Sequence, residues 1–145
     1  MIDTGLEKTY KALPLAERMA LAVSDALPRE YRALMLREQW MQIKCYFARR
    51  ADLTAEEYTA LLDDDDHVIR LCIAKRGDLP IELIERCASD RDPNVRYFIA
   101  RNPGLTETLR QRLLADPDPL VRRAAAKGPK PVEYRQRPGQ TRLIR

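Results

Sequence analysis

The residues best suited to chemistry in this sequence are two series of cations that recur every 26 positions. The first series is Arg18, Lys44, Arg70, Arg96 and Arg122. The second series is Arg49, Lys75, Arg101 and Lys127. Cations repeated at a constant spacing can hold phosphate groups or an acidic peptide. Both series are therefore candidate binding residues.

The two series differ in their acidic neighbours. In the first series an aspartate precedes each of three arginines by four residues, as Asp66 precedes Arg70. An acidic residue four positions before an arginine forms a favourable pair on a helix, so these arginines are predicted to be held by their own helix caps. The second series has no acidic partner at a fixed offset, which makes it the better candidate surface. Its cations could also simply be favoured by helix C-termini.

No combination of residues predicts catalysis, a metal site or a cofactor. His67 is the only histidine, and it occupies the repeat position of Pro93 and Pro119, so we expect it to be exposed in a first helical turn. The run from Asp63 to Asp66 lacks the ligand spacing and the glycine of a calcium loop. The three cysteines, Cys45, Cys72 and Cys87, fit neither a disulfide framework nor a zinc site and are expected to be reduced.

The charge distribution separates a neutral body from a basic tail. The net charge is +4, yet residues 1 to 127 carry 21 basic and 21 acidic side chains, so the excess lies in 128 to 145. That segment contains three prolines and two glycines, which predicts a flexible tail over 130–145. Its Arg135, Arg137 and Arg142 could contact nucleic acid, or they could belong to a solvated end. With no apolar run long enough for a membrane span, we expect a cytoplasmic protein with no membrane partner.

The 26-residue period predicts an all-α protein built from repeated helix pairs. The clearest columns are Ala48, Ala74, Ala100 and Ala126; Ile43, Ile69, Val95 and Val121; and Leu27, Leu53, Leu79 and Leu105. First helices are predicted to start after Thr54, Pro80 and Thr106, with a capping box between Thr54 and Glu57. Second helices are predicted to start after the aspartates Asp66, Asp92 and Asp118, which cap the free amides.

The recurring alanine predicts close packing between neighbouring repeats. Ala74 points away from the apolar stripe of Ile69, Cys72 and Ile73, where a long polar residue would otherwise be tolerated. A single helix pair cannot bury its apolar face alone, so the pairs must stack into a solenoid.

The motif Asp-x-Asp-Pro-x-Val-Arg-x-x-x-Ala-x-Asn-Pro, at Asp90–Pro103 and again at Asp116–Pro129 with Gly128 in place of the asparagine, resembles the leucine-rich repeat variant family. The resemblance implies a right-handed α-α superhelix related to armadillo repeats over 44–129. Some members carry an N-terminal cysteine-rich domain with an iron-sulfur cluster. This chain offers only Cys45 before residue 72, so no cluster is expected. The family supplies no catalytic residues.

Residues 1–43 form the predicted helical capping region with a degenerate repeat. No Asp-x-Asp break separates its two helices, so a single helix over about 29–49 is predicted. Trp40 replaces the capping aspartate, and we expect it to seal the end of the core.

These features predict a non-enzymatic scaffold that binds a protein partner through the stacked second helices. The alternative is nucleic-acid binding through the cation series and the tail, against which the neutral body argues.

Overall fold

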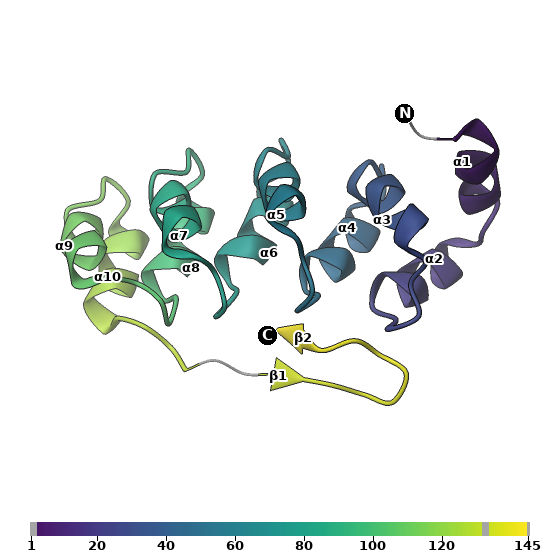
Figure 1. The fold of residues 1–145 in the computed structure, drawn as a ribbon. Helices are drawn as coiled ribbons and strands as arrows, with labels where there is room; N and C mark the ends of the chain where they lie inside the picture. Colours follow the sequence, from purple (N-terminus) through teal and green to yellow (C-terminus); the bar gives the residue numbers. More distant parts are fainter. Residues whose placement is uncertain (1–2, 132–133, 145) are drawn as a thin grey trace.

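The computed structural model describes residues 3–131 and 134–144, which contain ten helices and one small two-stranded sheet (Figure 1). The helices are α1 (Thr4–Lys11), α2 (Leu15–Ala22), α3 (Arg29–Leu36), α4 (Met41–Ala48), α5 (Ala55–Leu62), α6 (His67–Ala74), α7 (Ile81–Ala88), α8 (Pro93–Ala100), α9 (Glu107–Leu114) and α10 (Pro119–Lys127). The strands are β1 (Tyr134–Arg135) and β2 (Leu143–Ile144). The all-α prediction is confirmed, since the strands found in the described ranges are each two residues long.

The helices follow the 26-residue register. The second helix of each pair begins at residue 15, 41, 67, 93 or 119, and the first helices from α3 onward begin at 29, 55, 81 and 107. The pairs stand side by side along the molecule, from α1 and α2 at one end to α9 and α10 at the other (Figure 1). None of the helices in the described ranges is long and apolar enough to cross a membrane.

Local side-chain chemistry starts the helices where the sequence predicts. Thr54 and Glu57 form the reciprocal capping box of α5. Asp66, Asp92 and Asp118 each accept a hydrogen bond from a backbone amide in the first turn of α6, α8 or α10. These predictions are confirmed, because a cap depends only on residues a few positions apart.

The alanine column lies where consecutive second helices touch. α2, α4, α6 and α8 each pack on the next second helix in the row, which ends at α10. Ala48, Ala74 and Ala100 are fully buried in these contacts. Ala126 is exposed, because no helix pair follows α10. The predicted close approach of neighbouring repeats is therefore confirmed for the interior copies.

The predicted single helix over 29–49 is wrong. α3 ends at Leu36 and α4 begins at Met41. The break is stabilised by Glu38, whose buried carboxylate accepts hydrogen bonds from the Tyr10 hydroxyl (2.7 Å) and from Arg18 (2.6 Å). Glu38 thus substitutes for the first aspartate of the missing motif.

Trp40 does not seal the core as expected. It adopts an extended backbone (φ −87°, ψ 110°) at the N-cap of α4, and its side chain makes no capping hydrogen bond. The residue is 43% exposed, whereas Leu34 and Met35 of α3 are buried. Trp40 therefore lies at the surface, at the start of α4.

Residues 134–144 of the predicted tail lie against the body in this structure, and the mobility of the tail stays a prediction. β1 and β2 pair antiparallel, and the segment lies along the loops that follow α2 and α4 (Figure 1). Leu143 and Ile144 are only 5% and 3% exposed, so they provide the apolar contact that the Pro and Gly content obscured. The predicted tail residues 132, 133 and 145 lie outside the described residues.

Candidate binding surface around α4

The first cation series joins neighbouring repeats. Arg70 donates to both carboxylate oxygens of Asp90, at 2.8 and 3.2 Å, and Arg96 donates to both of Asp116 at the same distances. Lys44 binds Asp64 at 2.6 Å. Each partner lies 20 residues further along the chain, in the next repeat. The structural interpretation holds for these residues, but the partner is not the helix cap that the sequence suggested.

The two aspartates of each Asp-x-Asp motif have separate tasks. The first, such as Asp116, accepts the arginine of the preceding repeat and also the backbone amide of the second, Asp118, at 2.9 Å. Burial alone would raise the pKa of Asp116, but the hydrogen bonds from Arg96 and from that amide hold it below its ordinary value. The same pairing raises the pKa of Arg96.

Arg122 ends the first series. It donates to the backbone carbonyls of Asp116 and Pro117 and is exposed. Among the described residues it has no carboxylate partner, because no further repeat supplies one.

A third periodic series was missed by sequence reasoning. Arg50, Arg76 and Asn102 follow the alanine column by two residues and are 2%, 1% and 1% exposed. Each donates to two carbonyls of the preceding repeat; Arg76, for example, binds the carbonyls of Ala48 and Arg50 at 2.7 and 2.6 Å. The recurrence of a polar residue every 26 positions was the signal in the sequence that could have revealed this series.

The second cation series is divided by the structure. Lys75 lies over the Phe98 ring, with its Nζ 4.4 Å from the ring centre, and Arg101 donates to the carbonyl of Gly128. Lys127 is exposed in the last turn of α10. Arg49 differs from these three, because it lines two grooves, one on each side of α4.

The groove between α4 and α6 has a volume of about 510 Å³ and a largely apolar lining. Met41, Cys45 and Tyr46 of α4 line it together with Cys72 of α6 and Lys75, the residue that follows α6. The groove is further lined by Gln42, Arg49 and, from the tail, Ile144. It is therefore a site assembled from two repeats and the C-terminal segment.

The two thiols in this groove are neighbours. A hydrogen bond to Cys72 is the main cause that raises the pKa of Cys45. The same contact lowers the pKa of Cys72, and Lys75 and Arg49 favour its thiolate further. Cys87 is buried elsewhere, and this burial raises its pKa to about 12. The structure thus brings two thiols together beside two cations, which the sequence spacing did not reveal.

The groove between α2 and α4 has a volume of about 360 Å³ and brings predicted site residues together. Arg49 of the second cation series and Arg135 and Arg137 of the tail all line it. Its other lining residues are uncharged: Met19, Ala20, Val23, Tyr46, Gln140 and Leu143. The third predicted tail cation, Arg142, lies apart from this groove, 4.0 Å from the ring centre of Tyr134.

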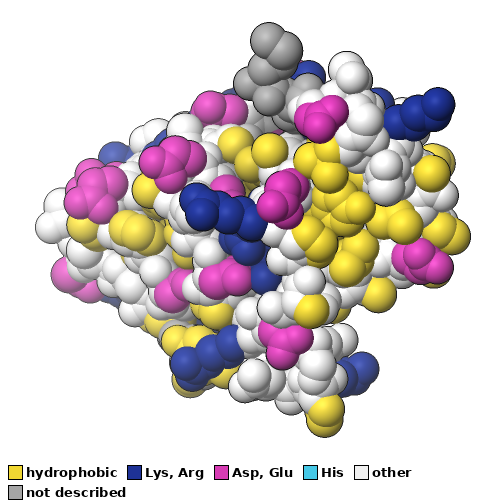
Figure 2. All heavy atoms as spheres, turned by 45° about the vertical axis from the view of Figure 1, so that its right-hand side comes forward, with side chains coloured by type: hydrophobic (Ala, Val, Ile, Leu, Met, Phe, Trp, Pro, Cys, Tyr) yellow, Lys and Arg dark blue, Asp and Glu magenta, His cyan; other side chains and the backbone are white. Residues whose placement is uncertain are grey.

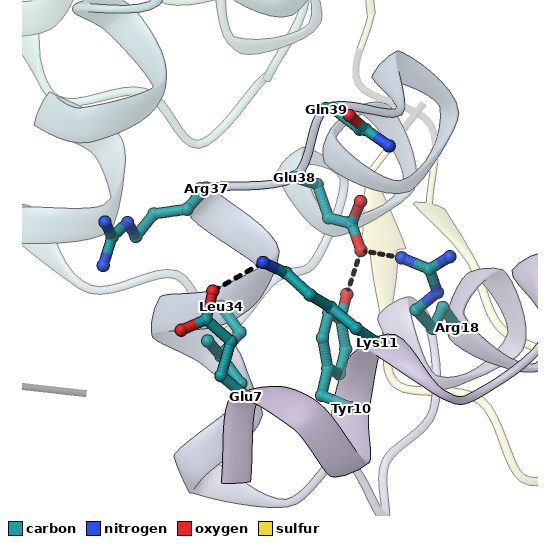
Figure 3. Close-up of a pocket in the computed structure, with 8 residues that line it drawn as sticks. All are labelled: Glu7, Tyr10, Lys11, Arg18, Leu34, Arg37, Glu38 and Gln39. Carbon is teal, nitrogen blue, oxygen red and sulfur yellow. Dashed lines mark hydrogen bonds and ion pairs between the residues drawn. The ribbon is translucent and has the colours of Figure 1, made fainter. Parts of the chain in front are cut away.

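A third hollow, of about 440 Å³, lies at the N-terminal end (Figure 3). Its carboxylates are bonded to groups of the same hollow: Glu7 to Lys11 at 2.6 Å, and Glu38 to Arg18 and Tyr10. Burial, then the bond to Glu38, raises the pKa of Tyr10. In Figure 3 the Arg37 side chain points away from this network. The arrangement closes the end of the core around Glu38.

His67 is the first residue of α6, and its side chain is 45% exposed, as expected for a first-turn residue. Its Nδ1 lies 3.9 Å from carboxylate oxygens of Asp66 and Asp92. The neighbouring Asp64 has a structural role, since its carboxylate accepts hydrogen bonds from Lys44 and from the backbone amide of Asp66.

No protein-family model, curated protein or solved structure matches this chain.

Proposed function

We propose that this chain is a non-enzymatic scaffold that binds a protein partner through the face built around α4. The observation that carries the proposal is the exposure of three large hydrophobic residues there: Trp40, Met41 and Tyr46 are 43%, 39% and 36% exposed. Two of them, Met41 and Tyr46, line the 510 Å³ groove to α6. Large exposed apolar residues gathered beside a groove are typical of a protein-binding site.

The distribution of charge supports the same proposal. Among the described residues, the first cation series is paired with carboxylates at all positions except Arg122, as in the pair Arg70–Asp90. Arg49 and Lys75 instead border the apolar groove, so an apolar segment with an acidic neighbour would fit it. Figure 2 shows hydrophobic side chains gathered on its right-hand part and charges of both signs scattered elsewhere, without a continuous basic face in that view.

The proposal includes the architecture implied by the repeat motif, a right-handed α-α superhelix of the leucine-rich repeat variant type. The helix starts at 26-residue intervals and the contacts between successive second helices support it. Free cysteines, as at Cys45, Cys72 and Cys87, suit the reducing cytoplasm that we also propose as its location.

Affinity capture from native extract, with and without nuclease, tests the function. We expect Met41→Asp to abolish capture of the specific partner and nuclease to leave it intact. The matched control is Leu120→Asp on α10, where Leu120 is 55% exposed and far from α4. Equal loss in both variants would contradict a binding face at α4.

Nucleic-acid binding is the second candidate, favoured by the three arginines that line the groove between α2 and α4. Binding to a duplex by neutralising phosphates would weaken steeply with salt, with a slope of about 0.9 per phosphate contact. Capture that disappears after nuclease treatment, together with such a slope, would favour this function over the first.

A further inference from the structure

Three arginines from distant parts of the chain surround one groove. Arg49 stands at the end of α4, while Arg135 and Arg137 belong to the C-terminal segment, and all three line the 360 Å³ groove between α2 and α4. Among residues 3–131 and 134–144, no aspartate or glutamate lines it. Within that part of the chain, the groove therefore has three positive charges and no lining carboxylate to balance them.

Backbone hydrogen bonds hold these cations in place. The amide of Ile144 donates to the carbonyl of Arg49 at 3.0 Å, and that of Thr141 donates to the carbonyl of Val23 at 2.9 Å. Pairing of β1 with β2 sets Arg135 opposite Leu143. The tail is thus attached on both sides of the groove, independently of any side-chain ion pair made by the three arginines.

Within 3–131 and 134–144, the three guanidinium groups make no ion pair and no side-chain hydrogen bond. This sets them apart from the buried Arg50, which donates to Asp52 and to two carbonyls, and from Arg70 and Arg96. Among the described residues, no protein group therefore takes up their hydrogen-bonding capacity.

Guanidinium groups match tetrahedral oxyanions because their planar forks donate in pairs. Gathering three positive charges without a counter-charge costs repulsion that a bound anion relieves, and a dianion relieves more of it than a monoanion does. Tyr46 and Gln140 add neutral hydrogen-bonding groups to the lining. We propose that this groove binds a phosphate monoester dianion, either free or attached to a protein side chain.

One consequence is that ligand binding and tail docking are linked. Arg49 belongs to the body and the other two cations to the tail, so a bound phosphate bridges them. A ligand that binds only the docked state must stabilise that state. This inference does not depend on the apolar groove to α6, so it can succeed or fail separately from the proposed scaffold function.

Titration calorimetry on the full chain at constant ionic strength tests the site, with inorganic phosphate and a phosphoserine peptide as probes. We expect saturable binding that Arg137→Gln weakens about tenfold or more, the loss typical of a hydrogen bond between charged groups. Arg123→Gln is the matched control, since Arg123 is an exposed arginine on α10 and does not line the groove. Its affinity should equal that of the unmodified chain.

A second measurement needs no variant. Hydrogen exchange at the Thr141 and Ile144 amides should slow on addition of phosphate and not on addition of chloride at equal ionic strength. Similar affinity for both probes would identify free phosphate as a sufficient ligand, and tighter binding of the peptide would identify a phosphorylated side chain; either supports the site. Absence of saturable binding, exchange insensitive to phosphate, or tighter binding of a single-stranded RNA than of either probe would overturn it.

Discussion

Asp116 illustrates, at the residue scale, how one carboxylate joins two repeats. It accepts two hydrogen bonds from Arg96 of the preceding repeat and one from the amide of Asp118, and its side chain is 6% exposed. Removing its charge leaves a largely buried guanidinium without its partner. The cost of such a loss greatly exceeds that of breaking a surface pair.

We predict that Asp116→Asn lowers the free energy of unfolding by about 2–3 kcal/mol. The side-chain oxygen of the asparagine can still accept the hydrogen bond from the backbone amide of Asp118, but the neutral side chain cannot balance the charge of Arg96. Asp63→Asn is the control: Asp63 pairs with Arg86, but both side chains are exposed, at 63% and 42%. It should cost less than about 0.5 kcal/mol. Urea unfolding measures both values, and equal effects would contradict the assigned role of Asp116.

The same carboxylates predict the dependence of stability on pH. The pKa values of Asp64 and Asp116 lie below the ordinary 3.8 because, although burial opposes it, Lys44 and Arg96 bind their charged forms. A lowered folded-state pKa contributes stability that is complete well above the unfolded pKa and is lost as pH falls through the folded value.

The thermal midpoint should therefore fall as pH decreases below about 4. In Asp116→Asn this decrease should be smaller, since one of the titrating groups is gone. A midpoint that is independent of pH between 5 and 2, or an acid decrease unchanged by the substitution, would contradict the linkage. Calorimetry across that range provides the measurement.

At the scale of the helices, the sequence predicted the features that depend on residues close in the chain and missed those that depend on distant residues. The caps at Thr54 and Asp92 and the 26-residue register were predictable, because helix starts are determined within one turn. The break before α4 was not, because Glu38 stabilises it through Tyr10 and Arg18, which lie 28 and 20 residues away.

The candidate site was predictable in part. The cation series identified Arg49 and the tail identified Arg135 and Arg137, but nothing local indicates that they share a groove. The sequence could also have predicted the partner of Arg70, because an acidic residue follows the basic residue by 20 positions in successive repeats. The nearer Asp66, four residues before Arg70, gave a simpler but wrong pairing.

Packing between second helices provides a test with an internal control. Ala74 is fully buried where α6 meets its neighbours, whereas Ala126, at the same repeat position of α10, is exposed. Ala74→Leu should destabilise the protein by about 1–3 kcal/mol, because added methylene groups must displace packed atoms.

Ala126→Leu should change stability by less than about 0.5 kcal/mol, as is usual for an exposed site. Both values come from urea unfolding of the full chain. If the two substitutions had the same effect, the last helix pair would not be the end of the stack in solution.

At the scale of the whole molecule, the C-terminal segment connects parts that are far apart in sequence. After α10 the Lys130 amide donates to the carbonyl of Arg101 at 2.8 Å, and further on Arg142 accepts from the Ala51 amide at 2.8 Å. The chain thus returns from its last repeat to the first two. Proline and glycine content could not predict these contacts, because composition does not show which loop groups a segment can bind.

The contact of the C-terminal segment with the body depends on two buried apolar side chains and a few backbone hydrogen bonds. Leu143→Ser removes one of those side chains, whose burial contributes about 1.5–3 kcal/mol. Part of that loss should appear as local opening of the C-terminal segment. Hydrogen exchange at the Ala51 amide, which donates to the carbonyl of Arg142, should then accelerate by about tenfold or more. Leu120→Ser, at a site 55% exposed on α10, is the control and should leave Ala51 unchanged. Hydrogen exchange resolved by residue distinguishes the two, and an Ala51 rate unaffected by Leu143→Ser would show that the tail does not cover this loop in solution.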